Sequence, residues 1–533
     1  MWISILASTV AIWMVFKLSK VGRRESTLPP GPPTIPLLGN AHIFPTKFAF
    51  FKFTEWSREY GDIYSLKVGT DTIVVVTSTK AVKELIDQQS GLTCDRPKSY
   101  MAETMYGDVH MTLIKYNDDW RLLRKNMHPI LTPAGAAQHQ PIQNAGATQL
   151  MYELLHSPER FFTHIQRYST SVITSIVFGK HYPHYECPEI DAAFKSIHAA
   201  ERVFGIGAHP PIDQLPFLNY IPDRWARWKR MAKWGNRLST RIYFHLLKVC
   251  EQRIEQGEEN GCYLENVIKH QEEYGLTRKM IGYLGGVFLD GGSHTTSAFL
   301  QTMILCLIAF PDSQRKAQEE IDSVTGHNRA PRLEDFTQLP YCQAIINETH
   351  RFRAVAPLGI PHAMRADGQY RNYILPKGTV IFVNTWGIYH DPDVYDNPEV
   401  FNPDRYLKNP FGTKTAVDLR EFRNINIAFG GGRRICPGMH LANASLALNV
   451  MNLLWAFDFS PATDPGTGKA IPTDVFNYDK GAFYAPVPFQ CSIKSRSAET
   501  ASIIDEELRS AQTIFEKFAG TDTIEVESVD ETF

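Results

Sequence analysis

The strongest constraint on the fold is one long, almost uncharged stretch in the middle of the chain. Residues 277–310 read TRKMIGYLGGVFLDGGSHTTSAFLQTMILCLIAF, and Pro311 follows directly. Apolar residues lie all around the helix axis, so we predict a helix that runs through the core rather than over the surface. Its 34 residues would extend about 50 Å. Charged residues at its start and the polar DGGSHTT inside it argue against the alternative, a second membrane span.

A second apolar run stands at the N-terminus. Residues 2–16 carry no charge, and Lys17, Lys20, Arg23 and Arg24 follow them. The run is shorter than the roughly 20 residues of a typical span, although the apolar stem of Lys17 extends it. A cleaved signal peptide would carry its positive charges before the apolar run. We therefore predict a retained anchor over residues 1–20 with the rest of the chain in the cytoplasm, the alternatives being a signal peptide or a peripheral helix.

The remaining boundaries follow from composition. Residues 21–40 are basic and then rich in proline, which predicts an extended hinge between the anchor and a body at residues 41–497. Residues 498–533 form an acidic tail with ten acidic and two basic side chains. In this tail we predict either a helix capped by Ser502 and ended by Gly520, docked on the body, or a disordered segment.

Short elements are predicted within the body. Residues 61–78 read as a hairpin of two strands, and residues 78–89 as a helix capped by Ser78. Most of the middle of the chain has helical periodicity. Residues 357–403 alternate short β-type runs with Pro-Gly and Asp-Pro turns, which predicts a small β-rich region.

Charge and cysteine content exclude several classes of protein. The net charge is −2 and the acidic tail accounts for its sign, so the body carries only a mild positive excess that does not indicate nucleic-acid binding. The eight cysteines form no CxxC pair. This pattern argues against a disulfide scaffold and a structural zinc site, and it suits a reducing compartment.

One cysteine stands in an unusual setting. Residues 428–438 read AFGGGRRICPG, and a helical pattern follows. Backbone N–H groups of a glycine-rich turn and the start of a helix both favour a thiolate at Cys436, and glycines let the backbone approach a flat cofactor closely. From the residues alone, Cys436 is equally a reactive nucleophile or a metal ligand.

The same stretch resembles the haem-binding loop of the cytochrome P-450 mono-oxygenases, whose pattern is F-x-x-G-x-R-x-C-x-G. Phe429, Gly432, Arg434, Cys436 and Gly438 match that pattern. The resemblance implies that Cys436 is the axial ligand of a haem iron (haem b). It covers nearly the whole chain, up to about residue 495, and the details are similar to the microsomal class of eukaryotes, in particular fungi.

A charged network belongs to the same resemblance. ETHR at residues 348–351 matches the family's E-x-x-R, and PDRY contains Arg405 of a later P-x-R-[FY] segment. Glu348 and Arg351 share a helix face at this spacing. By resemblance, Glu348, Arg351 and Arg405 form a buried network on the cysteine side of the haem pocket.

Further residues are implied as contacts of the haem propionates. WRLLRK resembles the W-x-x-x-R helix of the family, in which Trp120 and Arg124 face one way. An indole N–H and a guanidinium can both donate to a carboxylate. Arg434 and His362 correspond to a third and a fourth donor by the same resemblance, and core packing is the alternative role of Trp120.

The long helix contains the remaining motif. GGSHTT at residues 291–296 resembles [AG]-G-x-[DE]-T-[TS], in which glycines open a groove for O₂ and Thr295 helps to deliver protons. His294 stands where the family usually has a carboxylate. A histidine can still relay protons because its pKa lies near neutral. Asp290 lies one turn earlier, and we predict an Asp290–His294 relay, the alternative being a tolerated substitution with water as the relay.

The resemblance also implies fold and function. It implies a mainly α cytochrome P-450 fold with a long central helix over the haem, a small β-rich region and one N-terminal transmembrane helix. It implies a haem mono-oxygenase that uses O₂ to oxidise an apolar small molecule, with electrons from NADPH supplied by NADPH–cytochrome P-450 reductase. The implied location is the endoplasmic reticulum membrane, and the implied context is fungal secondary metabolism or detoxification. The alternatives are a haem–thiolate isomerase, dehydratase or oxidative-coupling enzyme, and a haem-binding carrier or sensor.

Family positions also suggest the pocket and the partner surface. The pocket segments are residues 97–115, 200–219, 288–295, 356–360 and 481–484. Their aromatic side chains favour an aromatic or polycyclic substrate: Tyr106, Phe204, Phe288, Phe483 and Tyr484. Arg121, Lys125 and Arg433 are candidate contacts for the reductase, or simply solvated surface residues.

Overall fold

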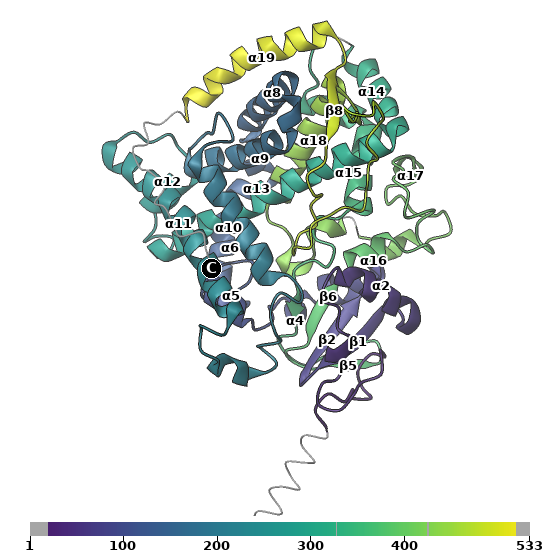
Figure 1. Ribbon diagram of the computed structural model, residues 1–533. Coiled ribbons are helices and arrows are strands. Elements are labelled where there is room, and N and C mark those ends of the chain that lie inside the picture. Colours follow the sequence, from purple (N-terminus) through teal and green to yellow (C-terminus); the bar gives the residue numbers. More distant parts are fainter. Residues whose placement is uncertain (1–19, 327, 424–425, 519–533) are drawn as a thin grey trace, which may run out of the picture.

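We describe the fold from a computed structural model, which describes residues 20–326, 328–423 and 426–518. A large helical body lies beside a small sheet, and the chain enters from the sheet side (Figure 1). Residues 1–19 of the predicted anchor, Gly520 and the end of the acidic tail lie outside the described residues. Within the described ranges, no single helix is both long enough and apolar enough to cross a membrane; only α13 (Arg278–Ala309) and α14 (Pro311–Thr325) together reach that threshold, with a bend of 106° between them.

Helices make up most of the body. The first half of the chain forms α2 (Ala49–Tyr60), α3 (Thr79–Ala81), the π-helix η2 (Val82–Gln88), α4 (Ser90–Thr93), α5 (Tyr100–Tyr106), α6 (Asp118–Leu131), α7 (Pro133–Ala137), α8 (Gln140–His156), α9 (Phe161–Phe178), α10 (Pro188–Phe204) and α11 (Arg227–Gln256). The second half forms α12 (Tyr263–Lys269), α13 (Arg278–Ala309), α14 (Pro311–Thr325), α15 (Pro340–Phe352), α16 (Thr385–Tyr389), α17 (Asp404–Lys408), α18 (Met439–Ala456) and α19 (Ala498–Glu516). The mainly α fold predicted from the sequence is confirmed.

Helix α13 is the central rod that the apolar stretch predicts. The hydroxyl of Thr277 accepts a hydrogen bond from the Met280 N–H and caps its start, and Pro311 begins the next helix. Most of its side chains are buried, and α9, α10, α11, α15 and α18 pack around it. Its place in the middle of the body is visible in Figure 1.

The β-rich region is small and combines distant parts of the chain. Strands β1 (Ile63–Val68) and β2 (Asp71–Val76) form the predicted hairpin, and β6 (Val380–Val383) joins β2 in parallel, with β3 (His362–Ala363) at its other edge. Two further antiparallel pairs are β4 (Gly368–Tyr370) with β5 (Tyr373–Leu375), and β7 (Phe457–Pro461) with β8 (Cys491–Ser495). The β-type prediction for residues 384–403 is wrong, because Asn384 caps α16 there through the Gly387 N–H.

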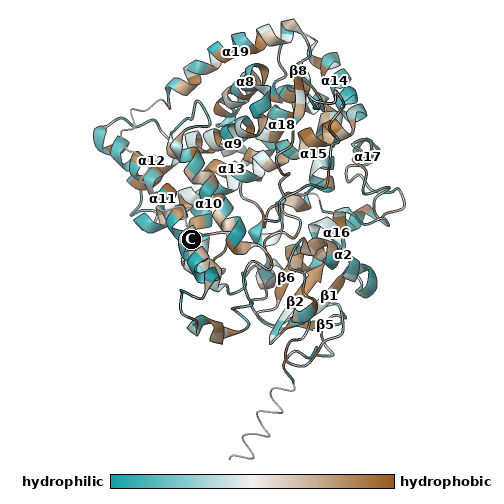
Figure 2. Ribbon diagram, in the orientation of Figure 1, coloured by the Kyte–Doolittle hydropathy of each residue, from teal (hydrophilic) through white to brown (hydrophobic). Residues whose placement is uncertain are grey.

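The predicted helix of the acidic tail is docked on the body. Helix α19 runs along α8, and Phe515 stacks on His181 with ring centroids 3.9 Å apart (Figure 1). Hydrophilic and hydrophobic residues alternate along it in Figure 2, as expected of a surface helix. The predicted cap at Ser502 is wrong, since Ser497 caps the helix by accepting from the Thr500 N–H and the first turn starts five residues earlier.

Candidate active site

The cysteine loop is a tight turn closed on itself. The backbone N–H of Cys436 donates to the Phe429 carbonyl over 2.8 Å, which folds the intervening residues into a loop just before α18. Gly430 and Gly432 have φ of +73° and +56°, where residues with side chains are strained. A Cβ at Gly432 would also stand 2.3 Å from the Ile86 carbonyl oxygen. These glycines therefore serve the turn and its close approach to η2.

The thiol of Cys436 lies at the start of a helix. The backbone N–H that hydrogen-bonds its sulfur belongs to Gly438, the last residue of the glycine-rich stretch and the N-cap of α18. Burial raises the pKa of the Cys436 thiol, while the Gly438 N–H and the nearby Arg124 guanidinium lower it. The loop thus holds one sulfur at the N-terminus of α18, where the helix dipole favours a thiolate.

The surroundings of Gly438 show whether a flat group has room beside this loop. Its φ of −82° is accessible to any residue, and a Cβ built on it meets no atom within 4 Å. Neither the backbone nor the packing of the described residues therefore requires glycine here. A cofactor that lies against the loop would require it, because a side chain would occupy the space next to the sulfur.

The carboxylate of Asp87, which sequence reasoning did not identify, binds the backbone of the cysteine loop. Asp87, on η2, accepts a hydrogen bond of 2.8 Å from the Gly432 N–H. Arg423 binds the same carboxylate through Nε at 2.5 Å and donates to the Gly430 carbonyl at 2.9 Å. Asp87 and Arg423 form no motif in the sequence, so only the structure identifies this clamp.

The predicted charged network is present and buried. Arg351 binds the Glu348 carboxylate with two hydrogen bonds of 2.7 and 2.8 Å, and Arg405 Nε lies 3.1 Å from the same carboxylate. The Asn402 N–H adds a bond of 2.7 Å. Glu348 and Arg351 are fully buried, so each charge depends on its partners. Arg351 also donates to the carbonyls of Tyr389 and Pro398, which ties α15 to the segment before α17.

Three arginines gather on the other side of the cysteine loop. All three donate hydrogen bonds to backbone carbonyls. Arg434 donates to those of Cys94, Met111 and Ile114, and Arg124 to that of Ile435. Arg96 donates to those of Thr112, Ile360 and Pro361. Sequence reasoning found Arg434 and Arg124 but missed Arg96, which belongs to no motif. Burial lowers the pKa of Arg96 to about 9 and that of Arg434 to about 10.

None of these three guanidinium groups forms an ion pair with a carboxylate in the part of the chain that the structure describes, and their hydrogen bonds go to backbone carbonyls. Burial lowers the pKa of Arg96 and of Arg434 by more than the Asp95 carboxylate raises it. Clustered cations that are partly or fully buried and not ion-paired are costly. An anionic group bearing two carboxylates, such as haem, fits this cluster.

Trp120 and His362 lie in the same cluster. The Arg434 guanidinium stacks over the Trp120 ring, 4.6 Å from its centroid. The Trp120 side chain is therefore packed in the core and also lies beside one of the predicted propionate contacts. His362 is buried, and its Nδ1 lies 2.9 Å from the Thr93 carbonyl, to which it donates. Burial lowers the pKa of His362 to about 3. The neutral ring then presents Nε2 as an acceptor, and the predicted donor role of His362 requires a second proton.

The GGSHTT motif forms one regular segment of α13. The hydroxyl of Thr295 donates to the Gly291 carbonyl over 2.7 Å. A Cβ on Gly291 would meet no atom within 4 Å, whereas one on Gly292 would stand 2.8 Å from Ile173. One glycine therefore leaves open space beside the helix and the other allows α9 to pack closely.

The predicted Asp290–His294 contact is wrong. His294 turns toward α10, where its Nε2 lies 3.3 Å from a carboxylate oxygen of Glu201. Asp290 turns the other way and accepts a hydrogen bond from the Tyr243 hydroxyl, with His110 Nε2 at 3.7 Å. The spacing put both residues on one face of the helix, but the packing of α10 and α11 against different sides of α13 separates their side chains.

The aromatic side chains proposed for the pocket divide into two groups. Tyr106 stacks on His110 and Phe204, and Phe483 lies 5.9 Å from the His294 ring, so these lie around the α13 motif. Tyr484 instead stacks on Tyr478 in the core beside the sheet, and the nearest ring to Phe288 is that of Tyr263 on α12. The prediction that Tyr484 and Phe288 face the pocket is not supported by these contacts.

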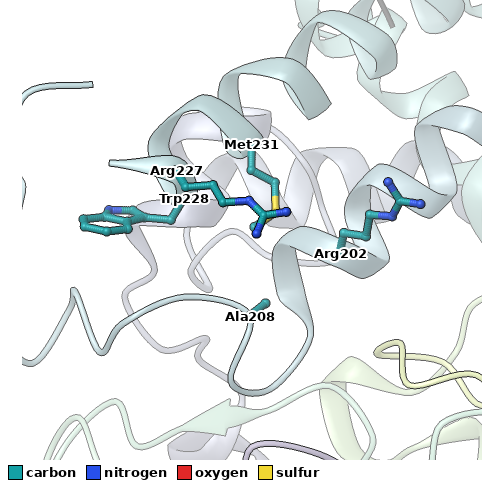
Figure 3. Close-up of a pocket in the computed structure, with 5 residues that line it drawn as sticks. All are labelled: Arg202, Ala208, Arg227, Trp228 and Met231. Carbon is teal, nitrogen blue, oxygen red and sulfur yellow. The ribbon is translucent and has the colours of Figure 1, made fainter. Parts of the chain in front are cut away.

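A cleft of about 460 Å³ opens elsewhere, between the end of α10 and the start of α11. Arg202, Ala208, Arg227, Trp228 and Met231 line it. Figure 3 shows Arg227 and Met231 on one helix, with Arg202 on another and Ala208 on the connecting loop. Arg202 and Ala208 belong to the predicted pocket segment 200–219, whereas none of the lining residues belongs to the cysteine loop or to the α13 motif.

Comparison with known proteins agrees with this geometry. The family model described as Cytochrome P450 matches residues 29–475. The cytochrome P450 monooxygenase ARMGADRAFT_1018417 of Armillaria gallica is 42% identical over 96% of this chain and 97% of its own length. The cytochrome P450 monooxygenase yanC of Aspergillus niger is 37% identical over 93% of this chain and 95% of its own length.

A solved structure is similar as well. A zebrafish cytochrome P450, solved with progesterone, superimposes with a TM-score of 0.68 at 25% identity. The match covers 84% of this chain and 99% of the zebrafish chain. The similarity therefore extends over most of this chain and nearly all of the zebrafish chain.

Proposed function

The chain belongs to the cytochrome P450 family and is a haem mono-oxygenase, and on that premise we propose that it is a membrane-tethered enzyme that inserts one oxygen atom into an apolar small molecule in fungal secondary metabolism or detoxification. Bound haem iron supplies the activation of O₂. The observation that carries the proposal is the pairing of one thiol, Cys436, with the cluster of Arg96, Arg124 and Arg434 beside its loop.

Each group of residues has a distinct role in this proposal. Cys436 binds the haem iron, while Arg96, Arg124 and Arg434 bind the propionates together with Trp120. His362 joins them as a donor when both of its ring nitrogens carry a proton. Glu348, Arg351 and Arg405 hold the segments that carry the loop. Thr295 and His294 bind and pass protons on the opposite side, where the open space at Gly291 lies.

Electrons would arrive from NADPH through NADPH–cytochrome P-450 reductase on the cysteine side. Arg121, Lys125 and Arg433 are exposed, and Arg433 reaches the Tyr116 hydroxyl near the loop. Arg121 already pairs with Asp118, so Lys125 and Arg433 are the freer cations for an acidic partner. The endoplasmic reticulum membrane is the proposed location, with residues 1–20 as the anchor.

The decisive experiment combines the full chain with the reductase in microsomes. We expect the carbon-monoxide difference spectrum of a thiolate-bound haem and a ligand-induced spectral shift with apolar compounds. Incubation with ¹⁸O₂ should add one labelled oxygen atom to the product. An unlabelled product of unchanged mass would support an isomerase, and ligand binding without NADPH consumption would support a carrier.

The location has its own test. The full chain should sediment with endoplasmic-reticulum membranes and resist extraction by high salt. A variant that lacks residues 1–20 should lose that resistance while it retains the thiolate spectrum. Equal membrane binding of the two forms would refute the anchor but not the chemistry.

A further inference from the structure

Three side chains link α13 to the protein surface. His294 Nε2 lies 3.3 Å from one carboxylate oxygen of Glu201, and the other oxygen lies 3.1 Å from Nδ1 of His198. The residues His294 and Glu201 are 5% and 8% exposed, whereas the His198 side chain is 49% exposed. A continuous line of titratable groups therefore runs from the core to solvent through α10.

The inner end of this line has an unused hydrogen-bonding atom. Nδ1 of His294 is buried and has no hydrogen-bond partner among the described residues. Buried polar atoms without partners are rare in folded proteins and call for an explanation. His294 directly precedes Thr295 in the motif assigned to oxygen chemistry, so this nitrogen belongs to a residue of that motif.

Mono-oxygenation requires protons at this place. Inserting one atom of O₂ into a substrate and reducing the other to water consumes two electrons and two protons. The electrons come from NADPH through the reductase, but the protons must cross the apolar packing around α13. Positioned titratable side chains are the usual means of such transfer.

Building on the proposed function, we propose that Glu201 and His198 complete a proton path from solvent to His294, with Glu201 also positioning the His294 ring. His198 takes a proton from water and passes it to Glu201 Oε2, and rotation of the carboxyl group presents it to His294 Nε2. In the tautomer protonated at Nδ1, His294 then releases the Nδ1 proton toward the Thr295 side. Each group gains and loses one proton, so the path returns to its initial state once the imidazole ring resets.

The charges around the path suit this direction. Burial lowers the pKa of His294, and Glu201 opposes that change. The hydrogen bond to Glu201 raises the pKa of His198 at the surface. Asp290 on α13 and Asp479 on a loop also favour the charged form of His294, and Arg202 on α10 disfavours that of His198. The outer imidazole therefore holds a proton more readily than the inner one.

Glu201→Gln is the variant that tests the path, and Glu189→Gln is its matched control. Glu189 is another buried carboxylate on α10 that contacts a histidine, His245, but its ion-pair partners lie on elements other than α13. The full-chain haem enzyme is assayed with reductase and 7-ethoxycoumarin as the probe, in H₂O and in D₂O. We expect Glu201→Gln to slow NADPH oxidation by roughly tenfold or more and to enlarge the solvent isotope effect. Glu189→Gln should match the unmodified chain in both.

A second readout is independent of turnover. Diethyl pyrocarbonate modifies neutral imidazole, so mass spectrometry of His198 against pH reports its protonation. Glu201→Gln should move that profile to lower pH, and Glu189→Gln should leave it in place. His198→Gln, a change at the surface, provides a second variant if Glu201→Gln does not retain haem, and it should enlarge the isotope effect too.

The outcomes separate this inference from the proposed function. A chain that binds no haem and oxidises no NADPH contradicts the proposed function. Normal turnover with an unchanged isotope effect in haem-loaded Glu201→Gln or His198→Gln contradicts the path alone. An unchanged His198 profile in Glu201→Gln contradicts the contact on which the path rests.

Discussion

The cysteine side and the α13 side of the site hold their charged residues in different ways. On the cysteine side Glu348 is bound by two arginines and a backbone N–H, and Arg351 reaches further carbonyls. On the α13 side His294 has one ion-pair contact, with Glu201, and one ring nitrogen without a hydrogen bond. Full satisfaction makes a network rigid, whereas a free nitrogen can exchange protons. The first side is therefore suited to hold a ligand in a fixed position, and the second is suited to proton transfer.

The largest expected effect comes from removing the thiol. Cys436→Ser should abolish NADPH-dependent oxidation and the thiolate-type carbon-monoxide spectrum, because a hydroxyl does not replace a thiolate on iron. Spectroscopy of the purified full chain with added haem measures this. Cys491→Ser, on β8 away from the loop, is the control and should behave like the unmodified chain. A surviving thiolate spectrum in Cys436→Ser would assign the ligand elsewhere.

Breaking the Glu348 network should cost the most stability. Glu348→Gln leaves two buried arginines with reduced compensation, and we expect a loss of about 3–5 kcal/mol in the free energy of unfolding. Thermal or denaturant unfolding measures it. The control is Asp404→Asn, at the position next to Arg405. Asp404 pairs with Lys316, both side chains are 40% exposed, and we expect the loss of this ion pair to cost less than about 1 kcal/mol. Equal losses of unfolding free energy in the two variants would show that the buried Glu348 network stabilises the fold no more than an exposed ion pair does.

Low pH should act on the cysteine side through His350. This side chain lies against Phe299 and Phe429, and burial lowers its pKa to about 4. Between the ordinary histidine pKa of about 6.5 and that value, the unfolded chain binds more protons than the folded chain. Stability should therefore fall as pH falls through this window, by up to about 1.4 kcal/mol per pH unit.

His350→Gln should flatten that part of the stability curve. Unfolding measured at several pH values between 7 and 4 gives the slope, with the exposed His156→Gln as the control. A slope that His350→Gln leaves unchanged would place the acid sensitivity in other groups.

The Asp87 clamp should have an intermediate effect. Asp87→Asn weakens the contacts to the Gly432 N–H and to Arg423, and we expect a loss of about 1–3 kcal/mol together with faster decay of the thiolate spectrum on warming. The rate of that decay measures how firmly the loop is held. A decay rate equal to that of the unmodified chain would contradict the positioning role.

The smallest effect on stability is expected on the α13 side. His294→Gln keeps a donor that can reach Glu201, so the free energy of unfolding should change by less than about 1 kcal/mol. The product formed per NADPH should nevertheless fall, because an amide does not pass protons. A large loss of stability would make His294 a structural residue like those on the cysteine side.

Prediction from sequence succeeded where the signal is local. The apolar run of residues 277–310 and its flanking Thr277 and Pro311 predicted α13 almost to the residue. The hairpin and the Ser78 cap were found in the same way, because turn residues and caps act within a few positions. The cap at Ser502 failed since Ser497 offered the same chemistry one turn earlier and the docking of α19 on α8 selected it.

The sequence by itself determined which residues could be proposed for the cysteine side. The thiolate loop, the E-x-x-R pair and the W-x-x-x-R helix match motifs of a known family that need particular residue types at fixed spacing, so that resemblance allowed Cys436, Glu348 and Trp120 to be named in advance. Only the tertiary structure decided the partners of those groups that face a distant segment: Glu201 for His294, Asp87 for the loop, and Arg96 among the arginines. The physical reason is that spacing along a helix places a side chain on a face, whereas the helix packed against that face decides what the side chain meets.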